Sequence, residues 1–182
     1  FRPEQMDSYE LGFKTSYLDG AGNFDIVAFM YDYKDAQVIS YVDVDFEDDG
    51  VTDAFSGRVL NVGQTDGFGV EASTTVAMSE YTTLYLSVGY LDTEATGLSE
   101  ICGADGAVEG DGLGCEGSRV FWAPEVTAAG KLDIDFPMQN GMIKSSIEVS
   151  YESERGGSWE GNPEGMIDAY AVTNLRIGYE SN

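Results

Sequence analysis

The most regular feature of this chain is an alternation of apolar and polar residues. In DSYELGFKTSY one face carries Tyr9, Leu11, Phe13, Thr15 and Tyr17, and the other face carries Glu10, Gly12, Lys14 and Ser16. A period of two is typical of a β-strand with one apolar side. The pattern predicts seven strands, at about residues 7–18, 23–41, 59–77, 80–95, 118–136, 141–154 and 167–181.

The second predicted strand is less regular than the others. In NFDIVAFMYDYKDAQV, Val27 and Phe29 fall on the face opposite Phe24, Ile26 and Met30. Long helical periodicity is absent, so we expect an all-β fold.

The predicted connections alternate in length. Short turns with Gly, Pro, Asn, Asp or Ser follow the first, third and fifth strands, in LDGAGN, AMSEY and FPMQNG. Long, acidic, Gly-rich loops follow the second, fourth and sixth, around 42–58, 96–117 and 155–166. Short turns at one end and long loops at the other are typical of an outer-membrane β-barrel.

A soluble β-sandwich would alternate in the same way, with its apolar face against a second sheet. Two features favour the barrel. The segments are long compared with the five or six residues typical of soluble strands. Aromatic residues also gather near strand ends, as in the girdles at lipid headgroups; these are Tyr9, Tyr17, Tyr31, Tyr33, Tyr81, Tyr90, Trp122, Tyr151, Tyr170 and Tyr179.

Composition and charge argue against several classes of protein function. The formal net charge of −24, with 9 Lys and Arg in 182 residues, argues against a nucleic-acid partner. No stretch approaches the roughly 20 apolar residues of a membrane-spanning helix. The sequence has no His, hence no Ser-His-Asp triad and no His-ligated metal, and we expect no enzyme activity. The carboxylates of Glu148 and Glu152 are expected to face the barrel interior, in contact with the plug, with lumen water, or with lysine and arginine side chains on neighbouring strands.

The order of motifs resembles the TonB-dependent outer-membrane receptors over nearly the whole chain. PEQMDSYELGFKTSYLDGAGNFDIVAFMYDYKDAQV resembles the C-terminal half of their barrel, with a Tyr-Glu-Leu-Gly-Phe-Lys strand, a Leu-Asp-Gly turn and an aromatic-rich Phe-x-Tyr-Asp-Tyr-Lys-Asp strand. Later strands of the family are similar to NVGQTDGFGVEAS, YLSVGYLDTEAT, APEVTAAGKLDIDF and YAVTNLRIGYES.

The resemblance implies an antiparallel transmembrane β-barrel in a Gram-negative outer membrane, with short periplasmic turns and long extracellular loops. Receptors of this kind have about 22 strands around a plug domain. Residues 1–182 would then be roughly strands 14 to 20, part of the C-terminal half of the barrel, with the plug and the other strands outside this chain. The implied partners are the plug, the TonB energy-transducing system, membrane lipids and lipopolysaccharide, and a small nutrient ligand.

Cys102 and Cys115 enclose twelve residues, GADGAVEGDGLG, in the longest predicted loop. We expect a disulfide, which would restrain that loop by about 3 kcal/mol in the chain-entropy model. Two free thiols or a metal pair are the alternatives, and a lone Cys pair without His is a poor zinc site.

The stretch DVDFEDDGVTDAFS resembles a calcium loop in part. Asp45, Glu47, Asp49 and Gly50 have the one, three, five and six spacing, but position twelve is Ser56 and no helices flank the loop. Oxygen ligands for Ca²⁺ would come from Asp43, Asp45, Asp48 and Asp49. A solvated acidic loop is the interpretation that we favour, with calcium binding as the alternative, and no other cofactor is indicated.

Ligand recognition is expected on exterior loops, where aromatic rings stack on ligands. The loop or rim aromatics to test are Phe46, Phe55, Trp122 and Trp159; packing within a girdle or loop is the alternative role for each. The leading interpretation is active import of a ferric siderophore, cobalamin, an oligosaccharide or a similar nutrient. The alternatives are a passive, porin-like or structural barrel, and a secreted β-sandwich that binds Ca²⁺ or carbohydrate.

Overall fold

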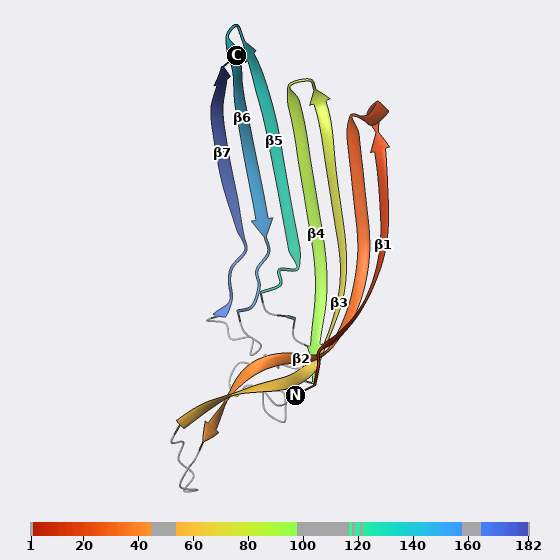
Figure 1. The fold of residues 1–182 in the computed structure, drawn as a ribbon, viewed down its shortest axis with the longest axis vertical. Helices are drawn as coiled ribbons and strands as arrows, with labels where there is room; N and C mark the ends of the chain where they lie inside the picture. Colours follow the sequence, from red (N-terminus) through yellow and green to blue (C-terminus); the bar gives the residue numbers. More distant parts are fainter. Residues whose placement is uncertain are drawn as a thin grey trace.

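A computed structural model describes residues 2–44, 54–97, 117, 119–120, 122–157 and 165–181. These residues form one antiparallel sheet of seven strands in the order β1-β2-β3-β4-β5-β6-β7 (Figure 1). The strands are β1 (Gln5–Tyr17), β2 (Gly22–Val44), β3 (Ala54–Ser79), β4 (Thr82–Thr96), β5 (Val126–Met138), β6 (Gly141–Glu152) and β7 (Tyr170–Ser181). Among the described residues, no helix is long and apolar enough to cross a membrane.

The short turns have the chemistry that the sequence predicts. Between β1 and β2 lies a single 3₁₀ turn, η1 (Leu18–Gly20), in which Leu18 and Asp19 adopt left-handed backbone conformations with φ of 52° and 54°. The β3–β4 turn begins with an irregular register between Ala77 and Ser79. The Tyr81 amide donates a hydrogen bond to the Ser79 hydroxyl, with 3.1 Å between the nitrogen and Oγ. The N-terminus lies on the side of the sheet that carries the long connections, and the C-terminus lies on the opposite side, with the short turns (Figure 1).

The strand register places most of the apolar residues of the seven strands side by side on one face. One row across the sheet runs Phe13, Ile26, Ala72, Val88, Ala128, Tyr151 and Ala171. The neighbouring rows on the same face of the sheet also consist mainly of apolar residues. We call these outward-facing rows together the apolar band. Its side chains are open on the outside of the sheet: Leu11 is 79% exposed, and Leu175 and Ile177 are each 70% exposed.

The sheet lacks an ordinary core. Among the described residues, Ala95 is the only buried hydrophobic residue. A soluble sandwich would cover the apolar face with a second sheet, whereas all seven strands here belong to one sheet. No second sheet among the described residues covers the apolar band.

The structure confirms the seven predicted strands and shifts some of their ends. The fifth strand begins at Val126 and not at residue 118. Trp122 has a left-handed backbone with φ of 65°, which breaks the pleat, and Pro124 has no amide hydrogen to pair with β4. Pairing resumes where the Leu91 amide donates to the Glu125 carbonyl at 2.8 Å.

The second and third strands extend beyond the predicted limits. Their pairing continues as far as Val44 and Ala54, through a stretch whose acidic residues had predicted a loop. The ladder is interrupted between the Lys34–Gln64 and Ala36–Val62 pairs, where Asp35 and Gly63 both have positive φ, 56° and 53°. Beyond them the hairpin bends away from the rest of the sheet (Figure 1).

Candidate functional site: the concave face

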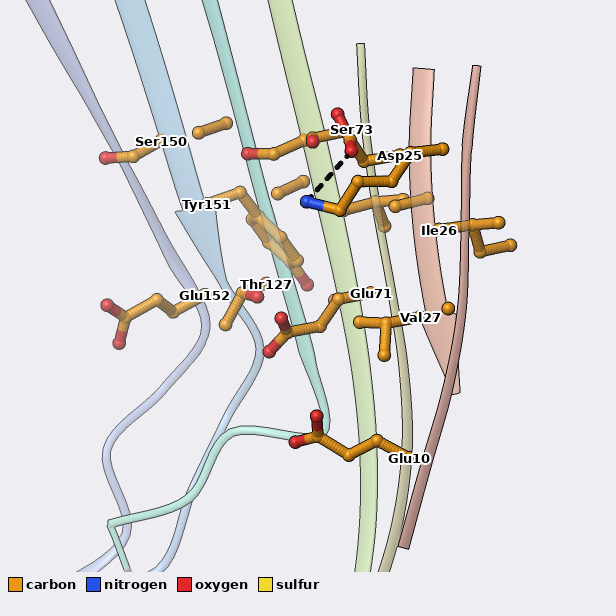
Figure 2. A pocket seen from close by; sticks show the side chains of 18 residues that line it. Glu10, Asp25, Ile26, Val27, Glu71, Ser73, Thr127, Ser150, Tyr151 and Glu152 are labelled. Carbon is orange, nitrogen blue, oxygen red and sulfur yellow. Dashed lines mark ion pairs between the residues drawn. The ribbon is translucent and has the colours of Figure 1, made fainter. Parts of the chain in front are cut away.

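The residues that alternate with the apolar band line a hollow on the other face of the sheet. This concave face carries polar and small side chains from six strands around a cavity of about 910 Å³ (Figure 2). Its residues include Glu10, Lys14, Asp25, Glu71, Ser73, Ser87, Gly89, Thr127, Ala129, Ser150 and Glu152. The period-two pattern thus separates a lipid-compatible surface from a polar one.

Several carboxylates line the hollow. Figure 2 shows Glu10, Glu71 and Glu152 spread over its wall. Glu71 reaches over the bare backbone of Gly89, where an added Cβ would lie 3.8 Å from its Cγ. Within the described part of the chain, neither Glu10 nor Glu71 has an ion-pair partner. The wall therefore presents unpaired negative charge to whatever fills it.

Three lysines on this face do have partners. Lys14 Nζ lies 3.3 Å from Asp25 Oδ1 on the neighbouring strand, and Lys144 Nζ lies 2.8 Å from Glu180 Oε2 across β6 and β7. Both pairs join neighbouring strands. The partner of Lys131 is Asp133 on its own strand, at 2.8 Å. These groups are largely exposed, so each pair contributes little to stability, about 0–1 kcal/mol.

Lys131 also marks a second, smaller hollow toward the short turns. Its ammonium lies 5.3 Å from the centre of the Tyr85 ring, and its backbone lies opposite Glu148 in the β5–β6 register. Tyr85, Lys131 and Glu148 line a cavity of about 200 Å³. Glu148 and Glu152 therefore both face the hollow side, as the sequence predicts.

Rings on β2 lie flat over glycines on β3. An added Cβ at Gly69 would lie 2.3 Å from Phe29 Cζ and almost equally far, 2.7 and 2.8 Å, from the two adjacent ring carbons. These distances place the Cβ beneath the ring and not beyond its edge. Tyr31 covers Gly67 in the same way, with two ring atoms at 2.3 Å.

These pairs explain why the second strand looked irregular in the sequence. Phe29 and Tyr31 are apolar residues on the polar face, where the missing side chains of Gly69 and Gly67 leave room for them. Sequence reasoning missed both rings, although the off-face position of Phe29 and the glycines of GFG were visible. The prediction that Tyr31, Tyr33 and Tyr170 belong to a lipid girdle is wrong. The strand register places all three side chains on the concave face, and not on the face that carries the apolar band.

Arg155 ties together the ends of β6 and β7. It forms an ion pair with Glu152 and lies 5.8 Å from the Tyr170 ring centre, while its backbone bridges to Ile167. The neighbouring Gly156 carbonyl accepts the Trp122 amide at 2.8 Å. This cluster therefore joins two of the long connections at one point.

The structure places only some of the predicted site residues. Trp122 is 57% exposed at this junction. Asp43 and Phe55 are not free loop residues, because they pair with each other in the extended β2–β3 ladder. Within the described part of the chain, no group of three or more acidic or cysteine residues is arranged to hold a metal. Phe46, Trp159, Asp45, Asp48, Asp49, Cys102 and Cys115 lie outside the described residues.

A sequence model of one protein family, described as TonB dependent receptor-like, beta-barrel, matches residues 1–182. No curated protein is similar enough in sequence to count as a relative.

Several solved structures share the fold. The ferric yersiniabactin uptake receptor FyuA of Yersinia pestis is 16% identical and superimposes with a TM-score of 0.71 over 98% of this chain. The ferric preacinetobactin receptor BauA of Acinetobacter baumannii is 16% identical, with a TM-score of 0.69 over the whole chain. The chain spans 23% of the length of each. It therefore has the fold of about a quarter of such a receptor.

Proposed function

Since the chain belongs to the TonB dependent receptor-like β-barrel family, we propose that it forms part of the wall of an outer-membrane receptor for active import of a scarce nutrient. The observation that carries the proposal is the division of one continuous sheet into an exposed apolar band and a polar, hollow face. A transporter barrel needs both surfaces, one for lipid and one for the lumen.

The apolar band has a suitable height for a bilayer. On β7 it runs from Ala171 to Tyr179, about nine residues, or roughly 30 Å along the strand. At a tilt of 35–45° this length covers roughly 23 Å along the membrane normal, close to the 25 Å band of outer-membrane barrels. Tyr9, Tyr90 and Tyr151 mark one border of the band and Tyr179 marks the other. We place the long connections outside the cell and the short turns in the periplasm.

The hollow face is proposed to hold the receptor's own plug domain. Residues 1–182 would supply part of the C-terminal half of the barrel, and Glu10 and Glu71 would accept hydrogen bonds from basic side chains of the plug. Open carboxylates on a solvent-accessible wall favour a positively charged contact surface. The plug would also carry the contact to the TonB energy-transducing system.

A ferric siderophore is the proposed ligand class, since the solved structures that share the fold include receptors named for such ligands. Trp122, which is 57% exposed in the β4–β5 connection and whose backbone amide donates to the Gly156 carbonyl, is the proposed ligand contact among the described residues. Phe46, Phe55 and Trp159 remain predicted ligand contacts. No cofactor is proposed, and calcium at Asp43, Asp45, Asp48 and Asp49 remains a prediction.

The test is uptake of radioactive iron complexes by cells that express the full-length receptor. Iron uptake that requires both the receptor and a functional TonB system would support the proposal. Uptake that persists without TonB would indicate a passive porin instead. Extraction of the receptor without detergent would contradict any barrel and favour the soluble sandwich.

A further inference from the structure

The β2–β3 hairpin extends beyond the strands on either side of it. β1 pairs with β2 as far as Lys34, and β4 pairs with β3 as far as Gln64. Among the described residues, the backbones of β2 and β3 pair only with each other beyond these positions. We call this two-stranded extension, residues 36–44 and 54–62, the arm.

The arm is separated from the sheet by a break in both of its strands. Asp35 and Gly63 have left-handed backbones at this level, with φ of 56° and 53°. Glycine adopts this conformation without steric cost, and aspartate is one of the few other residues that tolerate it. The hairpin bends at this level, out of line with the sheet (Figure 1). The arm can therefore change its angle here while the pairs on both sides of the break stay intact.

The residues that precede β1 bind the arm just beyond the break. The Arg2 amide donates to Oδ1 of Asn61 on β3. In return, Asn61 Nδ2 donates to the carbonyls of Arg2 and Asp35, at 2.9 and 2.7 Å. One half-buried amide side chain thus joins β2, β3 and the segment before β1.

The other strand of the arm is held by the same segment. Gln37 lies opposite Asn61 in the ladder. Its amide donates to Glu4 Oε1 at 2.8 Å, and its Nε2 donates to the Arg2 carbonyl at 3.0 Å. Arg2 Nη2 also lies 2.5 Å from Asp35 Oδ1, but the Arg2 side chain is 73% exposed, so this ion pair alone holds little. The arm cannot change its angle without breaking several of these bonds.

We propose that Asn61 and Gln37 form a lock with residues 2–4 that holds the arm at one angle. The break at Asp35 and Gly63 is the hinge about which the arm swings when the lock opens. The arm carries Phe55, so the lock sets where this predicted ligand contact lies relative to the barrel. Asn61 is therefore a positioning residue. The inference does not depend on which nutrient the receptor imports.

The test is double electron–electron resonance on the full-length receptor in nanodiscs. Nitroxides are attached to p-acetylphenylalanine at position 9 in β1 and position 41 in the arm, so that no cysteine is labelled. We expect one narrow distance distribution when Asn61 is present. Asn61→Ala removes three bonds of the lock and is expected to make the distribution roughly twice as wide. Asn61→Asp keeps the size and the acceptor but loses both donated bonds, and it should widen the distribution as well.

The matched control is Gln64→Ala, beside the break, where the side chain donates to Asp66 on its own strand. This variant should keep the narrow distribution. A broad distribution with Asn61 present would overturn the lock, and this measurement needs no variant to fold. An unchanged width in both Asn61 variants, or equal widening by Gln64→Ala, would overturn it as well. A narrow distribution in a receptor that imports no iron complex would contradict the proposed function alone.

Discussion

Two adjacent residues of β4 test which face of the sheet meets lipid. Leu86 lies in the middle of the lipid-facing stretch from Thr82 to Tyr90 and is 46% exposed, while Ser87 faces the 910 Å³ hollow. We predict that Leu86→Arg strongly destabilises the full-length receptor in a membrane and that Ser87→Arg does not.

The magnitude follows from the two surroundings. An arginine near the bilayer midplane of a barrel costs about 2–4 kcal/mol, and loss of the half-exposed leucine from its apolar contacts adds roughly 1 kcal/mol. The sum, about 3–5 kcal/mol, lowers the folding equilibrium constant by roughly 100- to 5,000-fold. Ser87→Arg adds a solvated cation to an acidic wall and should cost less than about 1 kcal/mol.

The assay is equilibrium urea unfolding of the receptor in lipid vesicles, followed by tryptophan fluorescence. A variant that unfolds at a lower urea concentration, while the slope of its unfolding free energy against urea concentration is unchanged, has lost stability. Equal losses for the two variants would refute the separation of faces, and a larger loss for Ser87→Arg would mean that the faces are reversed.

The remaining predictions concern single features. Gly69→Ala places a Cβ 2.3 Å from a Phe29 ring atom and should cost about 1–3 kcal/mol, whereas Gly178→Ala, with nothing within 4 Å, should change the melting temperature little; equal effects would contradict the ring-over-glycine packing. Thiol titration of the unfolded, unreduced receptor should detect neither Cys102 nor Cys115, and two free thiols would exclude the disulfide. Trp122→Ala should weaken binding of the imported iron complex at least 10-fold without lowering receptor levels, and unchanged affinity would remove Trp122 from the ligand contacts.

Much of the architecture follows from local pattern. Alternation fixes where a strand exists, because one face must be apolar, and Gly, Asp and Asn fix where the chain reverses. Strand ends were less predictable: Trp122 and Pro124 end the pleat for reasons of backbone geometry that a hydrophobic pattern does not register. The β2–β3 hairpin extends to Val44 and Ala54, although acidic residues such as Asp43 predicted a loop there.

The site was harder to predict than the fold. Phe29 contradicts the pattern of its own strand, and its position makes sense only once the register brings Gly69 beneath it. The row of carboxylates formed by Asp7, Asp32, Asp66 and Glu94 was equally hard to predict. Asp7 and Glu94 are far apart in sequence, and neither is unusual alone. A single sequence gives the residues of each strand, while register decides which of them become neighbours.

The order β1-β2-β3-β4-β5-β6-β7 also has a kinetic meaning. Every strand pairs only with its neighbours in sequence, so the sheet can grow one hairpin at a time from nuclei at the short turns. The slowest closure is then the joining of β4 to β5, where residues 97–125 intervene and the chain entropy lost is about 2 kcal/mol greater than for a three-residue turn. A bond between Cys102 and Cys115 would shorten that span, so oxidation before membrane insertion would speed the step that limits assembly.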